Sequence, residues 1–220
     1  MKFYIYVAGI MFLFAMGIVM LINANVGLPP WDMFHIALSE RTGLTIGMSA
    51  ILTSLICLLI AYLFEVKPGI ITLMDAILIG LFVDLIMFIG FIPEQTTMLY
   101  GLIQLMGGLI VVSFCIANIY YINMSFGPRD GIVIALSKKL NLGRGVSKFI
   151  IELVVFILAF FMGGPFGVGT VIVAVSVGAF IGLWLKLISL ACDNTWGRFL
   201  ICRVLNSPLD SQSTQCSSRE

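Results

Sequence analysis

Long apolar stretches alternate with short polar segments along the chain up to about residue 190. A helix that crosses a bilayer needs roughly 17–25 mostly apolar residues, and six stretches meet or nearly meet this requirement. They are Phe3–Asn23, Ile46–Phe64, Ile70–Ile92, Leu99–Ile122, Val146–Met162 and Val168–Leu190. The fifth is the shortest and contains Glu152, so it matches the spanning pattern least well. We therefore predict about six membrane spans.

Two intervening segments, Trp31–Thr42 and Arg129–Leu140, are too short and too polar to span alone. Each is predicted to form a short helix in a connecting loop, either at the membrane surface or re-entering the membrane. The expected fold class is therefore all-α, a polytopic transmembrane helix bundle with short loop helices. From about Asp193 the chain becomes polar, and we predict a disordered tail there.

A shift of 98 residues aligns the two halves of the chain without a gap around a shared motif. Pro-x-Asp at 30–32 meets Pro-x-Asp at 128–130, and Ala-Leu-Ser follows the aspartate five residues later in both. Further matched pairs are Asn25/Asn123, Gly47/Gly145, Gly69/Gly167, Gly80/Gly178 and Phe82/Phe180. Because each half carries three spans, the second half enters from the opposite side. We predict an inverted-topology repeat, with 1–98 as the first membrane repeat, 99–192 as the second and 193–220 as a cytoplasmic polar tail.

Composition agrees with a membrane protein. Hydrophobic residues make up 60% of the chain and charged residues 10%, against about 25% charged in a soluble domain, so membrane lipid is the expected partner. The net charge of +1 argues against nucleic-acid binding. The five cysteines form no CxxC pair and no His/Cys cluster, so neither a disulfide framework nor a metal site is expected. The lone histidine, His35, is matched by Val133 and is expected at a surface or an interface.

Lysine and arginine lie almost entirely on one side of the predicted topology. With six spans, eleven of the twelve basic residues fall on one side, and only Arg41 falls on the other. Since basic residues are retained on the cytoplasmic side of a membrane, we predict that the N- and C-termini are both cytoplasmic.

The motifs Pro30-Trp31-Asp32 and Pro128-Arg129-Asp130 are the first candidates for chemistry. Proline suits the first turn of a helix, and an aspartate there complements the helix dipole, so capping is one interpretation. The alternative is that both helix starts lie in a cavity near the repeat interface, where the two carboxylates bind a cation or a proton. Asn25 and Asn123, just before each motif, are then candidate further ligands.

Three acidic side chains lie within the predicted spans. Asp84 is deep in the third span, where an ionisable group marks either a function or a structural hydrogen bond, and both interpretations stay open. Asp75 is nine residues earlier, about 180° around the helix, so the two cannot line one face. Glu152 follows Lys148 by four residues, and an i,i+4 ion pair accounts for it; a place on a solute or ion pathway is the alternative.

Proline and glycine mark the candidate hinge and packing positions. These are Pro30, Pro128, Gly164, Pro165, Gly167, Gly178 and Gly182. The glycine-rich run 163–169 joins the last two spans and permits a tight reversal or a hinge. The last two glycines form a GxxxG motif, which lets two helices approach closely.

The sequence Gly-Leu-Pro-Pro-Trp-Asp at 27–32, Gly-Pro-Arg-Asp at 127–130 and the glycine-rich final hairpin resemble the YczE/YitT-like group of bacterial membrane proteins. The resemblance covers about residues 3–190. It implies a bacterial cytoplasmic membrane but supplies no agreed substrate or catalytic residues. The large C-terminal domain of the longer YitT-type relatives has no counterpart here, so no sensing role is implied.

No Ser/His/Asp arrangement, HExxH, P-loop or GxGxxG motif occurs, so we expect no enzyme, no catalytic residues and no cofactor. Inverted repeats are common in secondary transporters. We therefore expect a secondary transporter or permease for a small solute or ion, with Asp32, Asp130 and Asp84 near its pathway. The alternative is a non-transporting scaffold or accessory protein that supports another enzyme or complex. The sequence does not indicate an oligomeric state.

Overall fold

The computed structural model describes residues 2–121 and 127–193, and these residues form helices joined by short loops. The helices are α1 (Lys2–Asn23), α2 (Pro30–Thr42), α3 (Ile46–Leu63), α4 (Ile70–Ile89), α5 (Met98–Tyr121), α6 (Pro128–Leu140), α7 (Arg144–Phe161) and α8 (Val168–Asp193). No strand occurs in the described ranges. The all-α fold class is confirmed, whereas the predicted polar tail lies outside the described residues except for its first residue, Asp193.

Five of these helices are long and apolar enough to cross a membrane, namely α1, α3, α4, α5 and α8. The helix α7 has the same length as α3, 18 residues. It differs because Arg144, Lys148 and Glu152 lie on one face at a spacing of four residues. Its assignment as a sixth span therefore stays a prediction.

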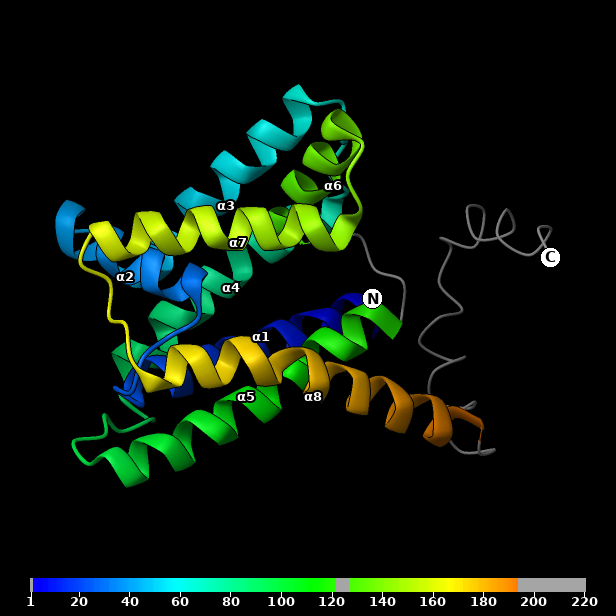
Figure 1. Cartoon of the computed structure of the whole chain (residues 1–220). Coiled ribbons are helices and arrows are strands. Elements are labelled where there is room, and N and C mark those ends of the chain that lie inside the picture. Colours follow the sequence, from blue (N-terminus) through cyan, green and yellow to red (C-terminus); the bar gives the residue numbers. More distant parts are fainter. Residues whose placement is uncertain (1, 122–126, 194–220) are drawn as a thin grey trace.

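The long helices run side by side between two ends of the molecule (Figure 1). At one end the loops after α1, α4 and α7 meet: the Gln95 N–H donates to the Asn23 carbonyl at 2.8 Å, and Arg41 Nε donates to the Met162 carbonyl at 3.1 Å. We call this the Arg41 end. The N-terminus and the loop 64–69 lie at the opposite end, which we call the Lys67 end.

The two short helices lie inside the bundle, between α3 and α7, and each packs on both of them. The last turn of α2 is at the Arg41 end. The last turn of α6 is at the Lys67 end, where Lys139 Nζ lies 4.6 Å from the centre of the Phe64 ring, just after α3. Their first turns meet between these ends, with Arg129 Cζ 4.9 Å from the centre of the Trp31 ring. The first turns of the half-helices α2 and α6 are therefore in the interior of the bundle, whereas their last turns, residues 40–42 and 138–140, are exposed.

Local sequence explains why the two half-helices begin and end at matched positions of the repeat. Each has proline at its first position, where the fixed φ favours a helix and no N–H bond is lost. Each is followed by a residue in the left-handed region, Gly43 (φ 72°) or Asn141 (φ 50°), which terminates the helix. Ser39 and Ser137 then donate to the carbonyl five residues later, at 2.7 and 2.8 Å. The sequence match at an offset of 98 is thus reproduced in local structure.

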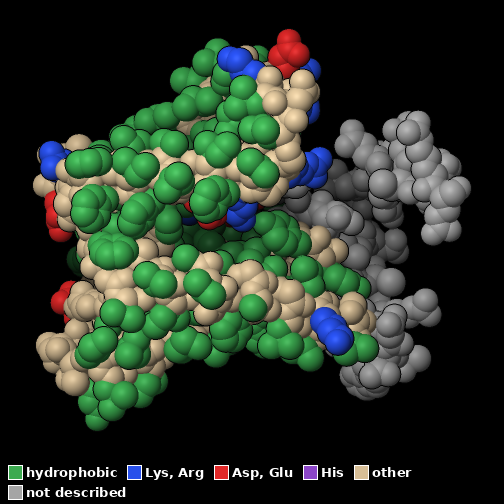
Figure 2. Space-filling model, viewed as in Figure 1, with side chains coloured by type: hydrophobic (Ala, Val, Ile, Leu, Met, Phe, Trp, Pro, Cys, Tyr) green, Lys and Arg blue, Asp and Glu red, His purple; other side chains and the backbone are tan. Residues whose placement is uncertain are grey.

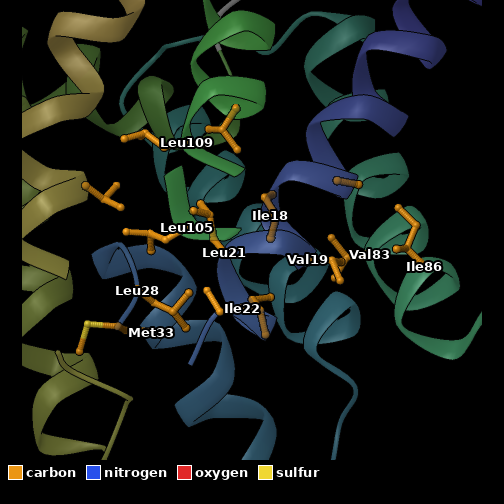
Figure 3. Close-up of a cluster of buried hydrophobic side chains, with 14 of the residues drawn as sticks. Ile18, Val19, Leu21, Ile22, Leu28, Met33, Val83, Ile86, Leu105 and Leu109 are labelled. Atoms are coloured by element: carbon orange, nitrogen blue, oxygen red, sulfur yellow. The ribbon is translucent and has the colours of Figure 1, made fainter. Parts of the chain in front are cut away.

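A cluster of buried apolar side chains joins α1, α4 and α5 and reaches α2 through Leu28 and Met33 (Figure 3). The helices α1 and α5 approach closely because a glycine of each faces the other: a Cβ on Gly108 would lie 3.0 Å from the Gly17 carbonyl oxygen. The face of the bundle seen in Figure 2 is also largely apolar, and many large apolar side chains are exposed, such as Phe88 at 91%. Such a surface is stable in lipid and costly in water.

The glycines of the GxxxG motif are not at a helix interface. No described atom lies within 4 Å of a Cβ placed on Gly178 or Gly182. The helix α8 packs along α5 and is not packed along α7, so the close packing predicted from this motif is absent from this structure.

Candidate functional site at the meeting of two half-helices

The first turns of α2 and α6 meet through a contact between an arginine and an aromatic ring. The Arg129 guanidinium lies over the Trp31 ring, a cation–π contact worth about 0.5–2 kcal/mol depending on its exposure to water. The two residues occupy matched positions, 98 residues apart. The contact therefore lies where the two predicted halves of the chain meet.

A buried carboxylate–imidazole pair lies on α2 beside this contact. Asp32 Oδ1 is 3.8 Å from His35 Nδ1, one helical turn later, and both side chains are buried. Burial raises the pKa of Asp32, and the Arg129 charge opposes that rise. Burial lowers the pKa of His35 well below its usual value, and the Arg129 charge lowers it further. His35 is therefore neutral at pH 7, at an interior interface and not at a surface.

Asp130 occupies the matched position on α6 but has different partners. Burial raises its pKa, whereas Lys148, Arg129 and a hydrogen bond from the Gly127 backbone lower it. Gly127 is the N-cap of α6, so this bond is of the kind that the capping interpretation predicts. Asp32 cannot make this bond because the N-cap of α2 is Pro29, which has no N–H.

Asp75 of α4 is a third carboxylate at this place. A Cβ on Gly127 would lie 3.4 Å from Asp75 Oδ2. Arg129 and Asp130 lie near enough to interact electrostatically with the Asp75 carboxyl group. The sequence indicates no link between Asp75 and the Pro-x-Asp motifs. The feature of the sequence that could have identified Asp75 as a site residue is that it is ionisable, lies inside an apolar span and has no charged neighbour in sequence.

Asp84 of α4 lies away from this cluster and contacts the start of α3. Its carboxylate accepts a hydrogen bond from Thr45 Oγ1 at 2.5 Å and another from the Gly47 N–H at 2.8 Å. These bonds satisfy free donors at a helix N-terminus and tie α4 to α3. The sequence left open a function or a structural hydrogen bond for Asp84, and the structure contains the hydrogen bonds of the second interpretation.

The remaining pathway candidates are distributed over the molecule. Asn25 is at the Arg41 end, where its amide donates to the Gln95 carbonyl at 3.2 Å, and Asn123 lies outside the described residues. Lys148 Nζ is 4.0 Å from Glu152 Oε1, so the predicted i,i+4 pair is confirmed. The Lys148 charge also lowers the pKa of Asp130, so this face of α7 is turned toward the cluster.

The hinge candidates of the 163–169 run make close backbone contacts at the Arg41 end. A Cβ on Gly164 would lie 2.9 Å from the Met33 carbonyl oxygen, and one on Gly167 would overlap the Val26 carbonyl. Pro165 is exposed between them. Only glycine permits this close approach of backbones, so in this conformation the loop is packed against Val26 and Met33.

Residues 1–186 match DUF6198, which is described as a family of unknown function. The chain belongs to this family. The chain is 30% identical to the uncharacterized membrane protein YczE of Bacillus subtilis, over 79% of this chain and 80% of that protein. It is 28% identical to the uncharacterized protein YyaS of the same organism, over 86% of this chain and 94% of that protein. An uncharacterized protein of Haemophilus influenzae is 27% identical over 77% of each chain.

These matches confirm the resemblance to YczE and a place in a bacterial membrane protein family. None of the solved structures matches this DUF6198 chain. The relatives' descriptions name no substrate.

A hollow in the surface of this DUF6198 chain gives access from outside the bundle to charged side chains. Between α7 and α8 the surface is hollowed, and basic and acidic side chains lie inside the hollow (Figure 2). A pocket of about 180 Å³ at the Lys67 end is lined by residues of α3, α4 and α6, by the loop between α3 and α4, and by Gly127, the N-cap of α6. Gly127 adjoins Asp75, so this pocket leads toward the carboxylates.

The cluster combines three carboxylates, Asp32, Asp75 and Asp130, with the cation Arg129 and a neutral imidazole. No group of three or more His, Cys, Asp or Glu side chains in the described part of the chain is arranged to hold a metal ion. The free N–H groups at two helix starts add partial positive charge. Such a mixed set suits binding of a proton or of a small polar or charged solute.

Proposed function

We propose that the protein is a secondary transporter or permease for a small polar or charged solute. The observation that carries the proposal is that α2 and α6 begin at one place inside the bundle, with Asp32, Arg129 and Asp130 in their first turns. Discontinuous helices whose starts point at a common centre are the usual way in which transporters build a site near the membrane midplane.

The helix contacts support an inverted repeat of two three-span halves, residues 1–98 and 99–192. Exchanging the halves turns α1–α4 packing into α5–α8 packing, α2–α3 into α6–α7, and α2–α7 into α3–α6, and all six contacts are present. The pair α1–α5 maps onto itself. In this proposal α7 is the sixth span, and its polar face is compatible with a membrane because it faces the charged hollow and not lipid.

The lengths of the half-helices fit this arrangement. Each has 13 residues, which is about 20 Å of helix, so two placed end to end match the thickness of a bilayer. The backbone groups at their starts would be costly in lipid, and such irregular backbone occurs at membrane depth only where protein or water surrounds it. This favours a solute-binding cavity at the centre over a purely structural interruption.

The proposal is tested by comparing metabolites inside cells and in the medium, in strains that lack or overproduce the protein. A solute that changes sides on overproduction, and fails to do so with Asp32→Asn or Asp130→Asn, is the expected result. Glu94→Gln, in the exposed loop after α4, is the matched control and is expected to behave as the wild type.

Two outcomes would contradict the proposal. An altered product without relocation of any solute would favour the accessory role over transport. If Asp32→Asn, Asp130→Asn and Asp84→Asn all left the phenotype intact at equal expression, the carboxylates would have no part in it.

A further inference from the structure

The hairpin of α3 and α4 is closed by direct contact between two glycines. A Cβ on Gly80 would lie 2.6 Å from the Gly47 carbonyl oxygen and 2.5 Å from Ile51 Cγ1. The two backbones therefore touch, and Asp84 joins the helices further through its bonds to Thr45 and Gly47. Since α3 begins at the Arg41 end, this contact seals that end between α3 and α4.

The matched hairpin of α7 and α8 carries the same pair of glycines but is open. Gly145 and Gly178 stand 98 residues after Gly47 and Gly80. No described atom lies within 4 Å of a Cβ on either of them, and the two helices are not packed along their lengths. The hollow with charged side chains lies between them (Figure 2).

We propose that α7 closes on α8 in a second conformation, with Gly145 against Gly178 as Gly47 now lies against Gly80. This inference rests on the inverted repeat of the proposed function. It commits to α7 itself as the element that covers the glycine face of α8. Small residues facing each other are what allows helices in lipid to pack backbone to backbone.

The position of the contact determines which end it would seal. Gly145 is in the first turn of α7, and α7 begins at the Lys67 end next to α6. Closure there would shut the hollow and cut the carboxylates off from the Lys67 end. The structure thus has α3 and α4 in contact at the Arg41 end, where a pocket of about 320 Å³ remains among the loops after α1 and α4. The hairpin of α7 and α8 is open at the Lys67 end, and the second conformation closes that hairpin.

We call the α3–α4 contact the first gate and the proposed α7–α8 contact the second gate. The first gate is held by the hydrogen bonds of Asp84 with Thr45 and Gly47, which we call the polar lock. The second gate has no such lock. Gly143 and Gly182 stand where the first hairpin has Thr45 and Asp84, so no carboxylate can bond the start of α7. Phe149 stands at the position of Ile51 and is now 66% exposed; closure would lay it over Gly178. This gate would be held by apolar packing alone and would open readily, which agrees with its being the open one here.

Disulfide trapping tests the closure. In a variant whose native cysteines are replaced by alanine, Gly145→Cys and Gly178→Cys are introduced together and oxidised in membranes. Because a disulfide needs Cβ atoms about 3.5–4.5 Å apart, it forms only in the closed conformation. Free thiols are counted by gel shift with a polyethylene-glycol maleimide after denaturation, and most monomers are expected to lose both thiols.

Two cysteine pairs serve as controls. Gly145→Cys with Val171→Cys is the negative control, because position 171 is two turns earlier on α8, about 10 Å along the helix, and is exposed. Thr45→Cys with Asp84→Cys is the positive control, because these side chains already meet. Absence of the 145–178 link while the positive control forms would overturn the proposal.

Two further measurements separate closure from its alternatives. A dimer formed by Gly178→Cys alone would show that a second copy covers α8, which also overturns the proposal. Adding Gly143→Thr and Gly182→Asp to the 145–178 pair copies the polar lock, and we expect disulfide formation to become several-fold faster. An unchanged rate would contradict the correspondence between the two gates. Trapping needs no solute, so its failure is distinguishable from a failure of transport.

Discussion

Trp31 and Arg129 lie in contact, 4.9 Å from ring centre to guanidinium carbon, at matched positions 98 residues apart. Two matched positions can touch only where the axis that relates the halves passes between them. The contact therefore marks the centre of the proposed repeat and explains why charged groups gather there. Each half contributes a helix start, and the differences between the halves, tryptophan against arginine and Pro29 against Gly127, give the two aspartates different environments.

Replacement of His35 by valine, the residue at the matched position 133, is expected to remove a pH dependence of stability. The pKa of His35 is lowered in the folded protein, so below about pH 6.5 the unfolded chain binds a proton that the folded protein does not bind. Stability is then lost as pH falls, by at most about 1.4 kcal/mol per pH unit for one group. The neighbouring charges, Asp32 and Arg129, are present in both proteins.

The measurement is the apparent melting temperature of the purified protein in detergent at pH 7.5 and 5.5. The wild type is expected to lose more than His35→Val. The raised pKa of Asp32 works in the opposite direction, because a folded carboxyl that takes up its proton at higher pH gains stability as pH falls. Equal losses in the two proteins would mean that His35 is protonated in the folded state.

Replacement of Asp84 by alanine is expected to destabilise the α3–α4 hairpin by about 1.5–3 kcal/mol, the usual range for hydrogen bonds to a charged group. Asp84→Asn keeps one oxygen that can accept from the Gly47 N–H and should cost less, as should Thr45→Val. The order of the three apparent melting temperatures checks this. A stable Asp84→Ala protein with a lost transport phenotype would instead place Asp84 on the solute pathway.

The periodic pattern of the sequence predicted the long helices to within a few residues, because apolar runs bounded by glycine, proline and polar residues determine helix bounds locally. The burial of Asp32 beside Arg129 and the approach of Asp75 to Gly127 could not be predicted this way. They depend on how α2, α4 and α6 pack, and no single stretch of sequence records that packing. The repeat offset carried more information than the motifs themselves, because it paired Trp31 with Arg129.

The orientation of the protein in the membrane is tested by labelling introduced cysteines. Glu40→Cys, near the end of α2, is expected to react with an impermeant maleimide in intact cells, and Lys138→Cys, near the end of α6, only after permeabilisation. Both side chains are exposed in the structure. The reverse result, or labelling of both from one side, would contradict the inverted repeat with cytoplasmic termini.

The matched glycines Gly80 and Gly178 give a paired test of the open and closed hairpins. Gly80→Ala places a methyl group 2.5 Å from Ile51 Cγ1 and 2.6 Å from a backbone oxygen, so α3 and α4 must separate, at a cost of about 1–3 kcal/mol. Gly178→Ala meets no described atom within 4 Å. It is expected to be neutral or to stabilise α8 by up to about 1 kcal/mol, because alanine is the better helix former.

Apparent melting temperatures of the two variants distinguish these effects, with a drop for Gly80→Ala and no drop for Gly178→Ala. The same pair also bears on the gate, because a methyl group at 178 would obstruct closure of α7 on α8 without harming the open conformation. Gly178→Ala should therefore retain stability and lose transport of whichever solute the wild type moves. If it lost stability as Gly80→Ala does, the hairpin of α7 and α8 would already be closed in the membrane, and the open conformation would not be the resting one.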